Sequence, residues 1–445
     1  MTQRLLVRSE DSAPPPPSGG VLPRWPFAAL FVGFPIWWVL GLVDVAWIMV
    51  AAVMCLYLAQ VRLRVPRGFG VWLLFLLWAG GSVIMVGGGM DLVGFAYRYL
   101  LYVASTVLAI YVYNAREQIT SRYVTGCLTV WWLVTVAGGY LGVVHPSGVW
   151  RTPASWLLTD SLLNNQLVNH MVVRRFAQYN PDSFLQVAPR PSAPFLYTNN
   201  WGNVFSLLLP FVLVYMWHVR GERKFWWLVA ALPVSAVPAL LTLNRGMFIG
   251  LGIALLYAAV RLAMRGSFKA IGALALVAAL GSALYMVLPI QERLAGRLDS
   301  SADATSNDTR ASLYLQAIEL VPDSPFFGYG APQAGAESGA APVGTQGQIW
   351  MLLVSHGPIA SICFVAFFAI ALLGAWRRID PVGTAAQTVL LVGLVELLYY
   401  GMLPNGLPIM MVAAALGLRP TDPPPDAPPD SPTDAYEAAA PGQPA

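Results

Sequence analysis

Apolar stretches of about twenty residues recur along the chain between Phe27 and Leu418, and short polar or charged segments separate them. A stretch of this length crosses the hydrocarbon core of a bilayer as a helix, so the pattern predicts an all-α, polytopic membrane protein. We expect about twelve transmembrane helices, near residues 26–43, 45–61, 70–87, 94–113, 123–144, 200–219, 225–243, 246–264, 268–288, 349–375, 385–402 and 407–418.

Two segments between the predicted helices are long enough to hold structure of their own, roughly 145–199 and 289–348. In the first, apolar residues at helical spacing predict an amphipathic helix that lies in the membrane interface and ends near Arg174-Arg175. The second predicts a short helix from about Asp308 to Leu320, followed by a flexible lid rich in glycine and alanine.

The amino-acid composition indicates the nature of the terminal segments and the class of protein. Residues 1–25 and 420–445 are rich in proline, and we expect both to be disordered tails of one transmembrane domain, 26–419. Only 11% of the residues are charged, against about 25% in soluble proteins, which excludes an ordinary soluble domain. The three cysteines do not have the spacing of a zinc site, and we expect no bound metal. We also expect no other cofactor and no nucleic-acid partner.

The positions of the basic residues predict the orientation. Most of the 26 lysine and arginine residues fall in alternate loops, so the positive-inside rule predicts that both termini are cytoplasmic. The cations expected in the outer segments are all arginine, whose planar fork matches phosphate oxygens. They are Arg151, Arg174, Arg175, Arg190, Arg245, Arg293, Arg297 and Arg310.

Arg245 is expected at the outer N-terminus of a membrane helix, where free amides and the helix dipole already favour an anion. The adjacent Gly246 would let a substrate approach the backbone closely. The alternative is an arginine that extends to lipid headgroups. Arg310, taken alone, is typical of a solvated loop arginine paired with Asp308 or Glu319.

The order of several short motifs resembles the O-antigen ligase and O-antigen polymerase (Wzy-type) superfamily, over roughly residues 185–375. That family has an arginine and glycine at a helix start, an outer-loop arginine, an aspartate-proline element that ends in Gly-x-Gly, and a His-Asn pair before a helical glycine. The corresponding elements here are Asn244-Arg245-Gly246, Arg310, Asp323-Ser324-Pro325-Phe326-Phe327-Gly328-Tyr329-Gly330, and Gln346-Gly347 ahead of Gly357. A further, upstream element of the family resembles Arg190-Pro191-Ser192-Ala193-Pro194-Phe195 with Thr198-Asn199-Asn200.

The resemblance implies metal-independent, inverting transfer of an oligosaccharide from an undecaprenyl-pyrophosphate carrier to a glycan or lipid-linked acceptor. The site would face the extracytoplasmic side of a bacterial inner membrane. Arg245 and Arg310 would hold the pyrophosphate, with Gln346 as a third catalytic residue near the acceptor. The other residues implied in substrate binding are Arg190, Asn244, Asp323 and Tyr329.

The glutamine at position 346 is a departure from the ligases of this family, which have histidine there. Glutamine can accept a hydrogen bond from a sugar hydroxyl but cannot take its proton, which favours a polymerase or a ligase-like enzyme with an unusual acceptor. We expect His356 to be a buried, hydrogen-bonded histidine. The open candidates for a general base are Asp160, His170, Asp182, Asp323 and Glu337.

Two charged residues, Arg98 and Glu396, are predicted inside the membrane. Either they pair with each other, or Arg98 lines a substrate cavity.

Two other functions remain open. Asp44, in the first outer turn, fits a polyprenyl-phosphate-sugar glycosyltransferase that uses an acid there. A lipid-linked oligosaccharide flippase or other transporter would also use outer arginines, but we find no inverted repeat and no paired broken helices.

Overall fold

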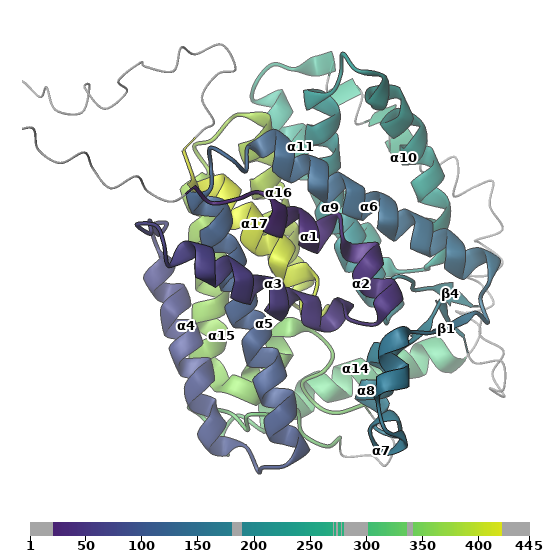
Figure 1. The fold of residues 1–445 in the computed structure, drawn as a ribbon, viewed down its shortest axis with the longest axis vertical. Helices are drawn as coiled ribbons and strands as arrows, with labels where there is room; N and C mark the ends of the chain where they lie inside the picture. Colours follow the sequence, from purple (N-terminus) through teal and green to yellow (C-terminus); the bar gives the residue numbers. More distant parts are fainter. Residues whose placement is uncertain are drawn as a thin grey trace, which may run out of the picture.

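The computed structural model describes residues 21–179, 189–269, 271–272, 275–276, 278–279, 301–335 and 341–420. It is mostly helical, and the C-terminal helix lies near the middle of the bundle (Figure 1). The main helices are α3 (Val43–Leu58), α4 (Phe69–Gly81), α5 (Met90–Asn114), α6 (Ser121–Val144), α9 (Thr198–His218), α10 (Arg223–Leu241), α11 (Arg245–Ala263), α15 (Gln348–Ala375), α16 (Pro381–Glu396) and α17 (Gly406–Leu418).

Within the described residues, six helices are long and apolar enough to cross a bilayer: α5, α6, α9, α10, α11 and α15. Shorter apolar helices accompany them, namely α3, α4 with the 3₁₀ turn η1 (Ser82–Met85), α16 and α17. Large apolar side chains such as Trp226, Trp227 and Leu256 are exposed on α10 and α11, as lipid-facing helices require. The chain is a multi-pass membrane protein. The expected number of twelve spans is not confirmed, and the predicted helix 268–288 falls largely outside the described residues.

The first predicted helix, 26–43, is wrong as a single element. The structure has two 7-residue helices there, α1 (Trp25–Phe31) and α2 (Phe34–Leu40). Pro35 in the first turn of α2 has no N–H group, and its ring would clash with the carbonyl of Phe31 if α1 continued. Helix α2 then ends at Gly41, whose left-handed backbone (φ 82°) is a common helix terminator.

Helix α15 is also broken, at Gly357, which has φ 81° and ψ 174°. Residues 348–356 and 358–375 form two helical parts, so the span expected at 349–375 is present, but with a kink that was not predicted. Tyr102 of α5 accepts a hydrogen bond from Gln348 and also contacts the ring of Phe364. Because both parts reach the same tyrosine, the first part folds back towards the second.

The break exposes carbonyl groups that a loop then binds. Pro358 has no N–H, so the carbonyl of Val354 loses its helical partner. The backbone N–H of Tyr329 donates to that carbonyl at 2.8 Å, and the N–H of Gly330 donates to the carbonyl of Ser355 at 2.8 Å. The loop therefore replaces the missing helical hydrogen bonds.

This docking explains the glycines of the run 323–330. A side chain at Gly328 would collide with the backbone of α15, and one at Gly357 would collide with the carbonyl of Phe326. Trp78 of α4 holds the other side of the loop, because its indole N–H donates to the carbonyl of Phe326 at 2.7 Å and its ring stacks on Phe327. The Gly-x-Gly element thus lets two backbones approach closely.

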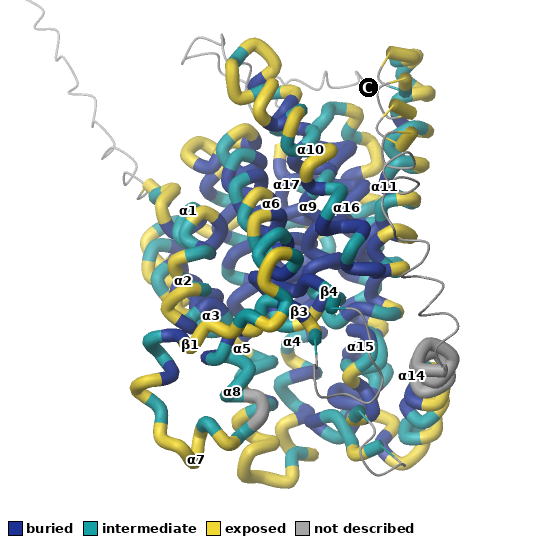
Figure 2. Tube along the Cα trace, turned by 90° about the vertical axis from the view of Figure 1, so that its right-hand side faces the viewer, coloured by how far each residue is buried: buried dark blue, intermediate teal, exposed yellow. Residues whose placement is uncertain are grey.

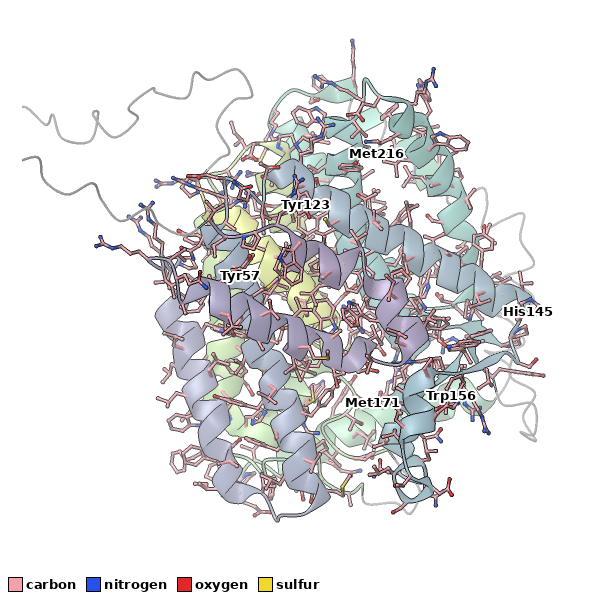
Figure 3. The ribbon with its side chains drawn as sticks, in the orientation of Figure 1. Tyr57, Tyr123, His145, Trp156, Met171 and Met216 are labelled. Carbon is pink, nitrogen blue, oxygen red and sulfur yellow. The ribbon has the colours of Figure 1, made fainter. Side chains whose placement is uncertain are left out.

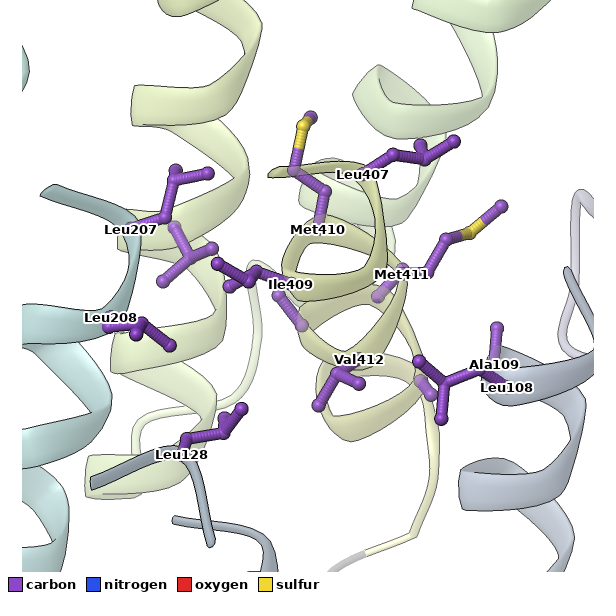
Figure 4. Packing of buried hydrophobic residues seen from close by; sticks show 14 of the residues in the cluster. Leu108, Ala109, Leu128, Leu207, Leu208, Leu407, Ile409, Met410, Met411 and Val412 are labelled. Atoms are coloured by element: carbon purple, nitrogen blue, oxygen red, sulfur yellow. The ribbon is translucent and has the colours of Figure 1, made fainter. Parts of the chain in front are cut away.

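Helix α17 is buried on all sides. Figure 4 shows its apolar side chains packed between residues of α5, α6 and α9, and Figure 2 shows that buried residues follow the axis of the bundle while exposed ones lie on the outer helices. Its sequence is apolar around the whole circumference, which is typical of a helix buried within protein. The labelled members are Leu407, Ile409, Met410, Met411 and Val412.

The first and last described segments lie at the same end of the bundle. The hydroxyl of Tyr123, near the start of α6, donates to the carbonyl of Arg24 at 3.2 Å. Arg419, which follows α17, is buried and donates to the carbonyl of Ile119 at 2.8 Å, just before α6. This agrees with both termini on one side of the membrane, although which side they occupy stays a prediction.

The amphipathic helix predicted within 145–199 is wrong as one element, because polar residues at 159–160 and 164–165 favour turns and caps. Figure 3 shows Trp156 and Met171 of this region away from Tyr123 and Met216, which lie towards the other end. The elements are β1 (Val149–Arg151), η2 (Pro153–Leu157), α7 (Asp160–Leu163), α8 (Gln166–Val172), β2 (Val173–Arg175), β3 (Ala177–Gln178) and β4 (Arg190–Pro191), with β1 paired to β2 and β3 to β4.

We expect replacement of Gly357 by alanine to destabilise the protein, because its backbone conformation disfavours a side chain by roughly 1–3 kcal/mol and a methyl group would meet the Phe326 carbonyl. Thermal unfolding of the purified protein in detergent measures the effect. Gly252→Ala in α11 is the matched control, since nothing lies near a Cβ there and alanine favours the helix. A Gly357→Ala midpoint equal to that of the control would contradict the docking of loop on helix.

Candidate functional site

The turn that joins α16 to α17, residues 397–405, binds the N-terminus of α15. The backbone N–H of Gln348 donates to the carbonyl of Tyr400 at 2.8 Å, and that of Ile349 donates to the carbonyl of Leu397 at 3.1 Å. The indole of Trp350 donates to the carbonyl of Leu398 at 2.9 Å. The first amides of a helix have no partner within it, and here the turn supplies acceptors for two of them.

The same turn binds the N-terminus of α11. The hydroxyl of Tyr399 donates to the carbonyl of Gly246 at 3.2 Å, and that of Tyr400 donates to the side-chain oxygen of Asn244. A side chain at Gly246 would collide with both tyrosine rings. The glycine therefore makes room for these rings, and the expected close approach of a substrate at Gly246 is wrong.

Arg245 directly follows a turn that is held by several hydrogen bonds. Asn244 is buried, and its amide also donates to the carbonyl of Thr198 at 3.1 Å, which ties α11 to α9. Leu243 has φ 50°, a left-handed conformation that is unfavourable for a branched side chain. Strained backbone of this kind is common at functional sites. Arg245 itself is the first residue of α11 and is exposed.

Arg190 lies beside the same turn. It belongs to β4 and its Nε donates to the carbonyl of Thr242 at 2.7 Å, three positions before Arg245 in the chain. Its charge also acts on Tyr400. Arg190 is therefore brought to the α10–α11 turn, as the order of motifs along the chain led us to expect.

Arg310 is carried by α14 (Ser301–Glu319), which begins before the expected start at Asp308. One turn further along, Tyr314 stacks on Trp350 with ring centroids 4.6 Å apart. Burial raises the pKa of Tyr314, and the charge of Arg310 opposes that rise, so the two side chains are close. Since Trp350 bonds Leu398, the helix of Arg310 is fixed to the same turn as the helix of Arg245.

Gln346 is half-buried. The next residue, Gly347, lies against the carbonyl of Leu398, so Gln346 is at the edge of the α16–α17 turn. Gln348, which is fully buried, was not among the predicted residues, because no motif marks it. The Gln348 amide donates to the Tyr102 hydroxyl at 2.9 Å and accepts from the N–H of Met402 at 2.9 Å. It fixes the buried start of α15.

Residues 230–351 match the family model described as O-antigen ligase. This segment is therefore similar to the O-antigen ligase family. The match confirms the resemblance to the O-antigen ligase and polymerase superfamily, whose members act in polysaccharide assembly as membrane glycosyltransferase-like enzymes on lipid-linked oligosaccharides. No curated protein matches the chain. The matched segment includes Arg245, Arg310 and Gln346, whereas Arg190 and the α16–α17 turn lie outside it.

The two charges predicted inside the membrane, Glu396 and Arg98, do not pair with each other. Glu396 is fully buried and accepts hydrogen bonds from Asn203 and Ser206 of α9, both at 2.7 Å. No ion pair joins Glu396 to Arg98, although the structure describes both residues, so the suggested pairing is wrong. His356 is buried and hydrogen-bonded to Ser82, as expected.

The other predicted residues that the structure describes form no hydrogen bond or ion pair with the α16–α17 turn, although Tyr329 packs against the same apolar cluster as Trp350. The Tyr329 hydroxyl donates to the carbonyl of Leu320 at 3.1 Å, burial and the neighbouring Asp323 raise its pKa, and Asp323 is exposed. Among the candidates for a general base, burial and Arg175 lower the pKa of His170, which keeps it neutral at pH 7. Asp182 and Glu337 lie outside the described residues.

Removal of the Tyr400 hydroxyl tests how firmly the turn holds Asn244. Tyr400→Phe leaves a buried amide oxygen without its donor, which costs about 1–3 kcal/mol, so we expect a lower midpoint of thermal unfolding in detergent. Tyr113→Phe is the control, because the described residues offer that hydroxyl no hydrogen bond. Equal midpoints in the two variants would show that the contact contributes nothing.

Proposed function

We propose that this protein transfers an oligosaccharide from a polyprenyl-pyrophosphate carrier to a glycan or lipid-linked acceptor. The reaction takes place at the extracytoplasmic side of a bacterial inner membrane, and Arg245 and Arg310 bind the pyrophosphate. One observation carries the assignment: the α16–α17 turn holds the helices of both arginines, through Tyr399 and Gly246 on one side and through Leu398 and Trp350 on the other.

The positive ends of two helices add to these arginines. The N-termini of α11 and α15 both meet the turn, and each carries the partial positive charge of its helix dipole. A pyrophosphate bound there gains from guanidinium groups and helix dipoles together. Arg190 at the α10–α11 turn adds a third cation.

The proposed reaction is a displacement in which the lipid pyrophosphate is a good leaving group. An acceptor hydroxyl attacks the anomeric carbon, the bond from that carbon to the pyrophosphate oxygen breaks, and the electron pair leaves with the pyrophosphate. Direct displacement inverts the configuration at this carbon. Fixed cations stabilise the developing negative charge without a metal ion, because they need no reorganisation during the reaction.

Gln346 favours a polymerase or a ligase-like enzyme over a typical ligase. Its position next to Leu398 puts it at the edge of the same turn. Its amide oxygen accepts a hydrogen bond from the acceptor hydroxyl and orients it, but does not take the proton. The proton passes to another base or to water.

The Asp44 alternative finds little support. The Asp44 carboxylate accepts from Arg174 at 2.6 Å, and the arginine is 4% exposed. This ion pair ties β2 to the start of α3, which is a structural role. The transporter alternative gains two interrupted elements, α1–α2 and α15, but the sequence shows no inverted repeat that would relate them.

Replacement of Arg245 tests the main assignment. We expect Arg245→Ala to lower glycan transfer by about 10²–10³-fold, and Arg245→Lys also to impair it because the fork is lost. Purified protein in detergent with a lipid-linked oligosaccharide provides the assay. Arg175→Ala, an exposed arginine of the outer region, should transfer normally. Near-normal turnover by Arg245→Ala would remove the assignment, and transfer in detergent excludes simple transport.

Asp44→Asn separates the two enzyme classes. If Asp44 only pairs with Arg174, the variant unfolds at a lower temperature, because a buried guanidinium loses its partner, but retains transfer below that midpoint. If Asp44 is the catalytic acid, transfer disappears while the midpoint changes little. Asp91→Asn, an exposed carboxylate at the start of α5, is the control for both measurements.

A further inference from the structure

A second polar group lies at the break of α15, away from the α16–α17 turn. His356 is 1% exposed, and Ser82 at the end of α4 is fully buried beside it. Three buried polar atoms here have no hydrogen-bond partner in the described structure: Arg98 Nε, Ser355 Oγ and His356 Nε2. Unsatisfied polar atoms are expensive inside a membrane protein, so their clustering needs a reason.

The hydrogen bonds of Ser82 fix the tautomer of the histidine. The Ser82 hydroxyl has one proton, and it donates that proton to the carbonyl of Ala79 at 2.7 Å. Its contact with His356 Nδ1, also 2.7 Å, therefore requires that Nδ1 carries the proton and donates to Ser82. Nε2 is then a bare acceptor, and it lacks a donor.

Arg98 is carried by the helix that packs against this imidazole, and its guanidinium lies one turn back over Gly94. Phe95, Arg98 and Tyr102 lie on one face of α5, and the rings of Phe95 and Tyr102 are 5.9 and 6.0 Å from the ring of His356. The charge of Arg98 acts on the histidine. No carboxylate forms an ion pair with Arg98 among the described residues, and Asp91, two turns away, acts on it only at longer range.

We propose that Arg98 and His356 form a subsite for an anion that also carries a hydroxyl group, namely an acidic sugar of the glycan substrate. The acid pairs with the guanidinium, and an adjacent hydroxyl donates to His356 Nε2. This inference rests on the proposed function only in taking the ligand to be part of a glycan.

The unprotonated Nε2 requires a donor beside the acid. The phosphate diester of a phospholipid supplies the charge for Arg98 but no proton, so a lipid would have to reach His356 through a hydroxyl or ammonium group elsewhere in its headgroup. A neutral sugar has the hydroxyl but not the charge. An acidic sugar offers both on neighbouring atoms, and a sugar bearing a phosphate monoester does so as well.

Thermal unfolding of the full-length protein in detergent tests the subsite without glycan transfer. We expect D-glucuronate to raise the midpoint by a few degrees, whereas D-glucose and dimethyl phosphate, which each lack one of the two features, leave it unchanged. The comparison of D-glucuronate with D-glucose 6-phosphate tells whether the acid is a carboxylate or a phosphate. Equal stabilisation by dimethyl phosphate, or by glycerophosphoglycerol as the headgroup of phosphatidylglycerol, would overturn the proposal in favour of a lipid headgroup.

Arg98→Met gives a second, independent result. An unpaired cation within the membrane destabilises the protein without ligand, so the variant should unfold at the same or a higher temperature and should lose the effect of D-glucuronate. An arginine with a purely structural role predicts a lower midpoint. Arg245→Ala, in contrast, should keep the effect of D-glucuronate. If Arg245→Ala transfers normally, the proposed function fails, and if Arg98→Met still responds to D-glucuronate, the subsite fails.

Discussion

The start of two helices at one short turn is the constraint on which the candidate site depends. A helix N-terminus inside a membrane protein must find acceptors for its free amides, and the α16–α17 turn supplies them to α15 from the carbonyl groups of Leu397 and Tyr400. The same turn reaches α11 through two tyrosine hydroxyls. With these bonds satisfied, the dipoles of both helices point at one place, and Arg245, Arg310 and Gln346 are attached around it.

Most buried charges in this protein already have a protein partner. Glu396 is bonded by two side chains of α9, Asp44 by Arg174, and Arg419 by carbonyl groups at the opposite end of the bundle. Satisfied groups of this kind stabilise the packing of helices and need no ligand. Arg98 differs, because the residues described around it supply a neighbouring charge but no bond. That contrast is a stronger reason to expect a ligand than the presence of a charge in the membrane.

Hydropathy predicted the long helices well. The spans expected at 94–113, 123–144 and 200–219 correspond to α5, α6 and α9, because a lipid-exposed backbone must satisfy its own hydrogen bonds and so forms helices. The break in α15 was missed although the Gly357-Pro358 pair marks it, since an apolar run hides such a signal. Contacts between Tyr400 and Asn244 or between Asp44 and Arg174 join residues more than a hundred positions apart. No spacing rule along one sequence reveals them.

The broken helix connects the two regions that we assign to the substrate. Residues 348–356 begin at the α16–α17 turn and end at His356, so by the rise of a helix the pyrophosphate region and the Arg98 subsite are roughly 12 Å apart along it. This separation is set by a rigid element, whereas the outer loops can change without altering it. A glycan held by its acidic sugar at Arg98 therefore presents a particular sugar unit to Arg245 and Gln346. Selection of the reacting unit then follows from the length of one helical segment.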